Sequence, residues 1–201
     1  MATKVAGKFQ PSAVATPANA ITAVRLLATL PVLVVIVHFG VSWTAALLWG
    51  AVASTDFLDG WVARRHGATT SGAFLDPLAD KILVLGALGA LAATDLTSWI
   101  PVVLIAGREL TISVYRSAVA RHGTSVPARP LGKAKTAAQD LAVGLILLPP
   151  TAEHYHWAGQ VLLWVSVGLA LISAAQYLLD SRRLGEVAAA APAGADEIPG
   201  L

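Results

Sequence analysis

The amino-acid sequence predicts an all-α integral membrane protein, a bundle of six transmembrane helices with both termini in the cytoplasm. Of the 201 residues, 56% are hydrophobic and only 13% are charged, which is too apolar for an ordinary soluble domain of this length. The hydrophobic residues also gather in six stretches, and each is long enough to cross a bilayer as a helix, which needs about 20 residues. These stretches are residues 20–39, 43–63, 73–93, 99–121, 131–150 and 157–180.

The stretches are predicted to be helices because polar and apolar residues do not alternate through them as they do in outer-membrane barrels. A helix also satisfies every backbone group within lipid. Residues 1–18 precede the first stretch and contain no continuous apolar run, so we expect a cytoplasmic arm and not a cleaved signal peptide. Residues 184–201 are mildly acidic and low in complexity, so we expect a disordered tail after one domain at 19–183.

The distribution of lysine and arginine predicts the orientation in the membrane. Most of these residues fall at the N-terminus, at alternate loops and at the C-terminus, whereas the loops around Gly40 and Asp95 contain neither. Trp43, Trp99 and Trp157 begin stretches at the opposite face, where aromatic residues anchor helices at the interface. We therefore expect a multi-pass protein of the plasma membrane. The total absence of cysteine excludes disulfides and thiolate metal sites.

Four carboxylates interrupt the apolar pattern where the second and third stretches meet. Asp56 and Asp59 are spaced i, i+3, and Asp76 and Asp80 are spaced i, i+4, so each pair shares one helical face. Because the connection between the stretches is short, all four side chains can converge near the cytoplasmic surface. Converging carboxylates repel unless a cation neutralises them, and hard oxygen ligands favour Mg²⁺ or Mn²⁺. A two-metal site is compatible with this pattern, and the alternative is a structural cation or a salt-bridge network.

The acidic segment also resembles a known family. Residues 56–64 read DxxDGxxAR and residues 72–80 read GxxxDxxxD, which is similar to the signature of the CDP-alcohol phosphatidyltransferases. These membrane enzymes join an alcohol to the phosphatidyl group of CDP-diacylglycerol. The spacer at 65–71 is one residue shorter than in most members. "NAITAVRLLATLP", at residues 19–31, resembles the entry of the family's first helix.

The resemblance implies two divalent ions, Mg²⁺ or Mn²⁺, held by Asp56, Asp59, Asp76 and Asp80, with Asp80 as the base that takes the acceptor's proton. It also implies a homodimer. No nucleic-acid partner is expected. The residues that the resemblance assigns to CDP-diacylglycerol are Asn19, Ala20, Ile21, Thr22, Gly60, Ala63, Arg64, Thr69, Thr70 and Gly72. Gly60, Ala63 and Gly72 are also small enough to leave room for a ligand beside the backbone.

Two further stretches indicate the acceptor. Residues 107–116 ("GRELTISVYR") and 131–140 ("LGKAKTAAQD") are similar to the subgroup that makes phosphatidylglycerophosphate from glycerol 3-phosphate. An acceptor phosphate needs a cationic pocket. The candidate residues are Arg116, Lys133, Lys135 and Arg108. Arg108 can equally form a structural ion pair with its neighbour Glu109, and the two lysines can serve as topology anchors.

Alternative functions follow from the same residues. Phosphatidylglycerol, which would give cardiolipin, and inositol phosphate remain possible acceptors because the acidic signature is common to these enzymes. Intramembrane acids beside helix breaks are also typical of ion-coupled transporters, which often carry inverted repeats with a site at the midplane. This chain shows no internal repeat, and its acids lie toward one membrane face. The sequence therefore favours the enzyme.

Overall fold

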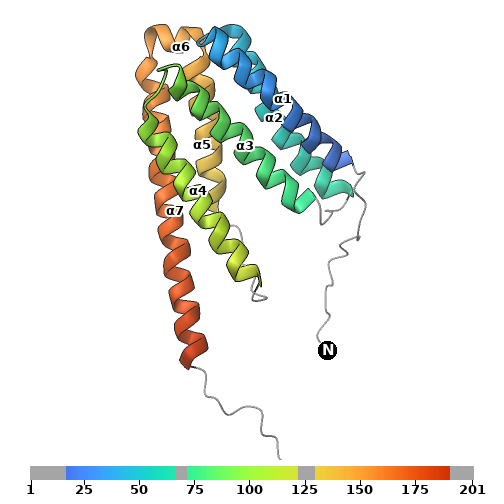
Figure 1. The fold of residues 1–201 in the computed structure, drawn as a ribbon, viewed down its shortest axis with the longest axis vertical. Coiled ribbons are helices and arrows are strands. Elements are labelled where there is room, and N and C mark those ends of the chain that lie inside the picture. The colour runs from blue at the N-terminus through green and yellow to red at the C-terminus, as the bar shows by residue number, and fades with distance from the viewer. Residues whose placement is uncertain (1–16, 67–71, 122–129, 191–201) are drawn as a thin grey trace, which may run out of the picture.

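The computed structural model describes residues 17–66, 72–121 and 130–190, and every regular element within these ranges is a helix. The predicted all-α class is therefore confirmed (Figure 1). In chain order the helices are α1 (Pro17–Phe39), α2 (Trp43–His66), α3 (Gly72–Ala93), α4 (Trp99–Arg121), α5 (Pro130–Leu147), α6 (Pro149–His154) and α7 (His156–Ala190).

Tight connections at one end of the bundle position the first four helices. Gly40 follows α1 with a φ of +52°, a conformation that glycine adopts without strain, and its N–H donates to the Ile36 carbonyl at 2.9 Å. Ser42 then caps α2, because its Oγ accepts from the Ala45 N–H at 3.2 Å. Asp95 adopts a φ of 59° between α3 and α4, which aspartate tolerates better than most side chains.

The end of the chain differs from the prediction in two respects. The predicted helix at 131–150 ends at Leu147, because Pro149 pushes Leu148 into an extended conformation with ψ of 118° and the short helix α6 follows. The last helix continues to Ala190, seven residues beyond the expected boundary at Arg183. The segment after Arg183 is rich in alanine, the residue with the highest helix propensity, so helix α7 extends into it.

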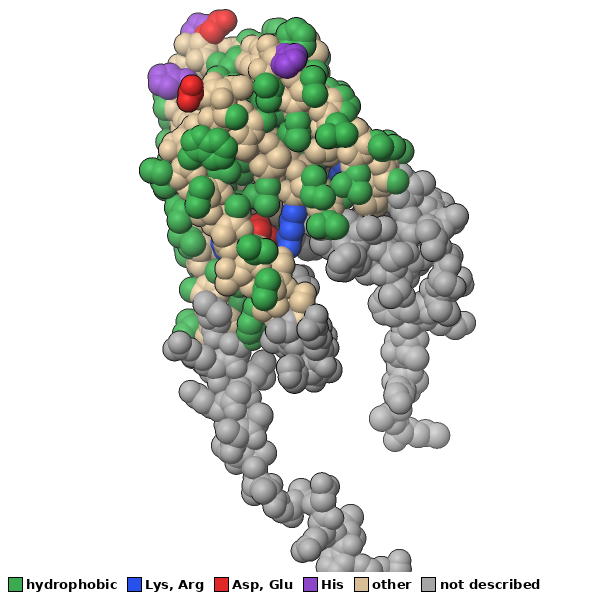
Figure 2. Space-filling view, in the orientation of Figure 1, with side chains coloured by type: hydrophobic (Ala, Val, Ile, Leu, Met, Phe, Trp, Pro, Cys, Tyr) green, Lys and Arg blue, Asp and Glu red, His purple; other side chains and the backbone are tan. Residues whose placement is uncertain are grey.

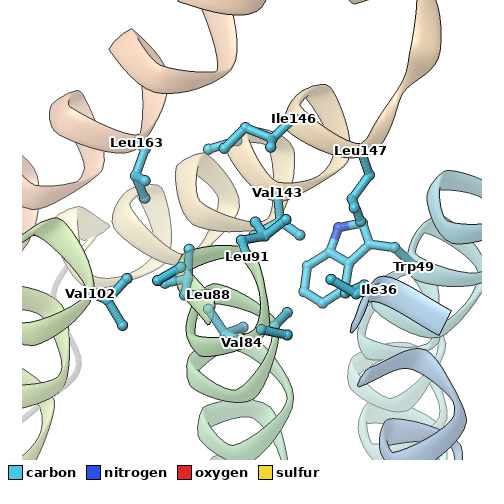
Figure 3. Close-up of a cluster of buried hydrophobic side chains, with 14 of the residues drawn as sticks. Ile36, Trp49, Val84, Leu88, Leu91, Val102, Val143, Ile146, Leu147 and Leu163 are labelled. Carbon is cyan, nitrogen blue, oxygen red and sulfur yellow. The ribbon is translucent and has the colours of Figure 1, made fainter. Parts of the chain in front are cut away.

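The helices pack as two groups that share a central core. Helix α1 packs along both α2 and α3, while α5 packs along α7, and α4 lies against α3 and α7 (Figure 1). Figure 3 shows Trp49 among the aliphatic side chains of the buried cluster. The Trp49 indole N–H also donates to the Asp140 carbonyl oxygen at 3.0 Å, which ties α2 to α5. This bond satisfies the one polar atom that the indole brings into the core.

The outside of the described bundle is apolar and much of its polar content is inside. Leu27, Leu47 and Leu110 are 72%, 68% and 68% exposed, and hydrophobic side chains are spread over the described surface in Figure 2. Arg25 and Arg108 are instead buried. A soluble protein rarely exposes so many large hydrophobic side chains, so this arrangement suits a lipid environment. Within the described residues, α1 and α7 are also long and apolar enough to cross a membrane.

Candidate active site

A cavity of about 130 Å³ lies between α3, α4 and α5. The predicted base Asp80 and the predicted acceptor residue Lys135 both line it, although they are 55 positions apart in the sequence. The complete lining is Asp80, Lys81, Val84, Leu85, Glu109, Lys135, Thr136 and Gln139.

Helix periodicity explains why these residues share the cavity. On α3 the lining residues are spaced by three or four positions, as Asp80 and Val84 are, and on α5 Lys135 and Gln139 follow the same spacing. Each helix therefore presents one face to the cavity. Helices α3 and α5 begin toward the same end of the bundle and run in the same direction (Figure 1). Asp80 and Lys135 therefore lie nearer that end than Val84 and Gln139 do.

Glu109 is the centre of the charges around the cavity. Its Oε1 accepts hydrogen bonds from Arg108 Nη1 at 2.8 Å and from Lys135 Nζ, and its Oε2 lies 3.9 Å from Lys81 Nζ. Arg108, Glu109 and Lys135 are all buried. Basic and acidic side chains can be seen together in the lower part of the described surface in Figure 2. One carboxylate thus holds cations from three helices, and burial strengthens each of these attractions.

Lys81 and Arg108 extend this network to further groups. Lys81 Nζ donates to Ser113 Oγ, and that hydroxyl donates to the Glu109 carbonyl oxygen at 2.6 Å. Arg108 Nε donates to the Ala170 carbonyl at 3.1 Å, and its Nη2 donates to Ser173 Oγ at 3.0 Å. Arg108 therefore connects α4 to α7 and pairs with Glu109, while it does not line the cavity that contains Asp80.

The other predicted site residues divide into two groups. Thr22 is 1% exposed within α1, and three positions later Arg25, also buried, donates from Nε to Thr55 Oγ1 of α2 at 3.2 Å. The remaining predicted side chains lie outside what the structure describes, and Thr69 and Thr70 also lie outside it as backbone. The predicted residues whose helical backbone alone is described are Asn19, Ala20, Ile21, Asp56, Asp59, Gly60, Ala63, Arg64, Gly72, Asp76, Arg116 and Lys133.

Comparison with known proteins decides the family. Residues 15–172 match the model of the CDP-alcohol phosphatidyltransferase family. The chain belongs to this family. The resemblance inferred from the acidic segment is thereby confirmed, and the match extends well beyond that segment.

Several relatives of this phosphatidyltransferase match it over most of their own length. A CDP-diacylglycerol–glycerol-3-phosphate 3-phosphatidyltransferase of Pseudomonas fluorescens is 36% identical over 173 residues, which is 80% of this chain and 87% of the relative. A probable phosphatidylglycerophosphate synthase of Mycobacterium tuberculosis is 36% identical over 186 residues, 90% of this chain and 87% of the relative. A CDP-diacylglycerol–glycerol-3-phosphate 3-phosphatidyltransferase of Escherichia coli is 38% identical over 162 residues, which is 76% of this chain and 88% of the relative.

The four aspartates of this phosphatidyltransferase offer oxygen ligands of the kind that divalent cations bind. Asp56 and Asp59 lie in the last turns of α2, and Asp76 and Asp80 lie in the first turns of α3. Six residue steps separate His66 from Gly72, so the two helix ends are at most about 20 Å apart. Carboxylate oxygens are the ligands that Mg²⁺ and Mn²⁺ prefer. Within the side chains that the structure describes, no group of three or more potential ligands comes together.

Sequence reasoning missed two features of the cavity. It treated Glu109 only as a neighbour of Arg108, and it gave Gln139 no role, although both line the cavity with Asp80. The signal for Glu109 was available, because an acid inside an apolar stretch is costly unless it has a partner or a function. Its three partners come from α3, α4 and α5, so only the folded chain reveals how they meet.

Proposed function

We propose that this protein transfers the phosphatidyl group of CDP-diacylglycerol to a hydroxyl of glycerol 3-phosphate, which gives phosphatidylglycerophosphate and CMP. Family membership supports the reaction type, and the names of the relatives above support both substrates. The observation that carries the proposal is the cavity in which Asp80 and Lys135 meet, because a proton acceptor and a cation are what an alcohol that bears a phosphate requires.

The chemistry assigned to this cavity is one displacement at phosphorus. The acceptor's hydroxyl oxygen forms a bond to the phosphorus that carries diacylglycerol, and the bond from that phosphorus to the phosphate of CMP breaks. The Asp80 carboxylate takes the hydroxyl proton as this happens. CMP leaves with the bridging oxygen, so atoms and charge balance.

Lys135 is the proposed partner of the acceptor phosphate. An ammonium group has three donors, and the hydrogen bond to Glu109 uses one of them. Glu109 therefore holds the Lys135 ammonium in place and leaves donors for a ligand. Arg116 lies near the C-terminal end of α4, and Lys133 lies near the N-terminal end of α5. Both are proposed to add positive charge for the acceptor phosphate.

The four aspartates are the proposed ligands of two divalent ions, Mg²⁺ or Mn²⁺. When bound, such ions offset the negative charge of the pyrophosphate and of the departing CMP. The proposed contacts to CDP-diacylglycerol are made by the first turns of α1, the end of α2, the α2–α3 connection and the first residue of α3. These residues are Asn19, Ala20, Ile21, Thr22, Gly60, Ala63, Arg64, Thr69, Thr70 and Gly72.

The proposed setting is the plasma membrane, with the six long helices spanning it, the active site facing the cytoplasm, and two copies forming a dimer. The apolar exterior supports the membrane part of this proposal. The described chain also begins and ends at the same end of the bundle (Figure 1), as an even number of spans requires. The end with Asp80 would then face the cytoplasm, where lysine and arginine predominate.

The test is CMP release by the purified protein, given CDP-diacylglycerol with glycerol 3-phosphate, inositol phosphate or phosphatidylglycerol in parallel. We expect turnover with glycerol 3-phosphate. Lys135→Gln should raise the KM for this acceptor by roughly ten- to a hundredfold, because it removes a charge-assisted contact. The KM for CDP-diacylglycerol should change little and serves as the internal control. Turnover with phosphatidylglycerol alone would overturn the proposal and indicate a cardiolipin synthase.

A further inference from the structure

The side chain of Gln139 brings an amide group into the interior of the described bundle. Gln139 is 3% exposed, and its Nε2 has no hydrogen-bond partner among the residues that the structure describes. Protein interiors rarely leave a buried donor unpaired, because the group has lost its hydrogen bonds to water. Gln139 also lines the cavity that contains Asp80 and Lys135. A donor in this position is therefore available to whatever enters the cavity.

The surroundings of Gln139 indicate what kind of atom it receives. The charged groups that line the cavity, Lys135 among them, lie nearer the end of the bundle at which α3 and α5 begin. Gln139 lies one helical turn further along α5, about 6 Å along the axis, and lines the cavity together with the apolar Val84 and Leu85. A phosphate at that depth would lose much of its hydration without a cation to replace it. A neutral hydroxyl needs only a hydrogen bond, which the amide can supply.

We propose that Gln139 donates a hydrogen bond to the non-reacting hydroxyl of a polyol phosphate acceptor and so determines acceptor specificity. The proposal rests on the proposed function, because it places the acceptor in this cavity. With its phosphate at Lys135, a three-carbon acceptor lies against the face of α5 that Lys135 and Gln139 share, and its secondary hydroxyl is directed to the Gln139 amide. The amide then holds the carbon chain so that the primary hydroxyl faces Asp80.

The test compares two acceptors, glycerol 3-phosphate and 3-hydroxypropyl phosphate, by CMP release at saturating CDP-diacylglycerol. The second compound keeps the phosphate and the primary hydroxyl but lacks the secondary hydroxyl. Wild-type protein should prefer glycerol 3-phosphate by about tenfold or more in kcat/KM, because the analogue leaves the amide unpaired. Gln139→Met should lower kcat/KM for glycerol 3-phosphate by about tenfold and leave that for the analogue within about threefold.

Gln160→Met is the matched control. Its amide is already satisfied, since its Oε1 accepts from Thr97 Oγ1 at 2.9 Å and its Nε2 donates to the Leu96 carbonyl at 2.8 Å. This variant should keep the wild-type preference between the two acceptors, whatever it does to stability.

Two results would overturn the assignment of Gln139. One is wild-type protein that uses both acceptors equally well, a result that stands even where Gln139→Met does not fold. The other is a Gln139→Met variant in which both acceptors lose the same factor, which would indicate a phosphate contact or a packing role. Either result leaves the proposed function intact, because glycerol 3-phosphate is still turned over. If neither acceptor releases CMP, the proposed function fails and this assignment fails with it.

Discussion

Replacement of Glu109 by glutamine tests whether one carboxylate holds the charged cluster together. Glutamine keeps the shape of the side chain and removes its charge. In the wild type this carboxylate accepts from Arg108 and Lys135 and lies 3.9 Å from Lys81. The variant leaves these cations without their shared counter-charge, and two of them are buried. We expect a loss of stability together with weaker acceptor binding, because Lys135 is no longer held in place.

The loss of stability depends on which hydrogen bonds and how much contact with solvent each cation keeps in the variant. Removal of one partner from a buried ion pair typically costs about 3–5 kcal/mol. Arg108 retains its bonds to Ala170 and Ser173, and the Lys81 side chain is 34% exposed, so neither bears the full penalty. Lys135 is therefore the main source, and we place the cost near the lower end, at about 3 kcal/mol. For a chain of this size the melting temperature should fall by roughly 6–12 °C.

The assay is thermal unfolding of the purified protein in detergent, followed by the fluorescence of its six tryptophans. Lys135→Met and the double variant complete a cycle. Lys135→Met alone should be less harmful than Glu109→Gln, because Glu109 keeps Arg108 and Lys81. The double variant should lose less stability than the two single variants lose together, by about 0.5–3 kcal/mol. Additive losses, or a Glu109→Gln melting temperature within about 2 °C of wild type, would refute the central role of this carboxylate.

Chelation should abolish activity and added Mg²⁺ or Mn²⁺ should restore it; full turnover in metal-free buffer would contradict the two-metal proposal. Asp80→Asn should mainly lower kcat and Asp56→Asn should weaken metal and CDP-diacylglycerol binding, so wild-type turnover by the Asp80 variant would refute its role as the base. Gly159→Ala should cost about 1–3 kcal/mol of stability, since the new Cβ would lie 2.6 Å from Ile146 Cγ1 across the α5–α7 contact. Gly168→Ala is its control, because the new Cβ would meet no atom within 4 Å apart from its chain neighbours and the nearby backbone of its own helix. This control should melt at or slightly above the wild-type temperature, while equal melting of both variants would show that α5 can adjust.

Most helix positions could be predicted because hydrophobic length and breaks are local properties. The five residues between α3 and α4, for example, are mostly polar and include Asp95 with its positive φ, and the predicted end at residue 93 matches Ala93. The break before Pro149 was missed because an apolar run masked a local backbone restriction. The helical extension to Ala190 was missed because low complexity was taken as evidence for disorder, although alanine favours helix.

Composition, the hydrophobic stretches and the order of the acidic residues are local properties of the chain, and they were enough to predict the all-α class and the family. The sequence also named Asp80 and Lys135 as candidates. The folded chain was needed to show that these two share a cavity, that Glu109 gathers cations from three helices, and that Gln139 Nε2 is buried without a hydrogen-bond partner among the described residues. The physical reason is that such contacts depend on which faces of α3, α4 and α5 meet, and helix packing sets this between residues far apart in the sequence.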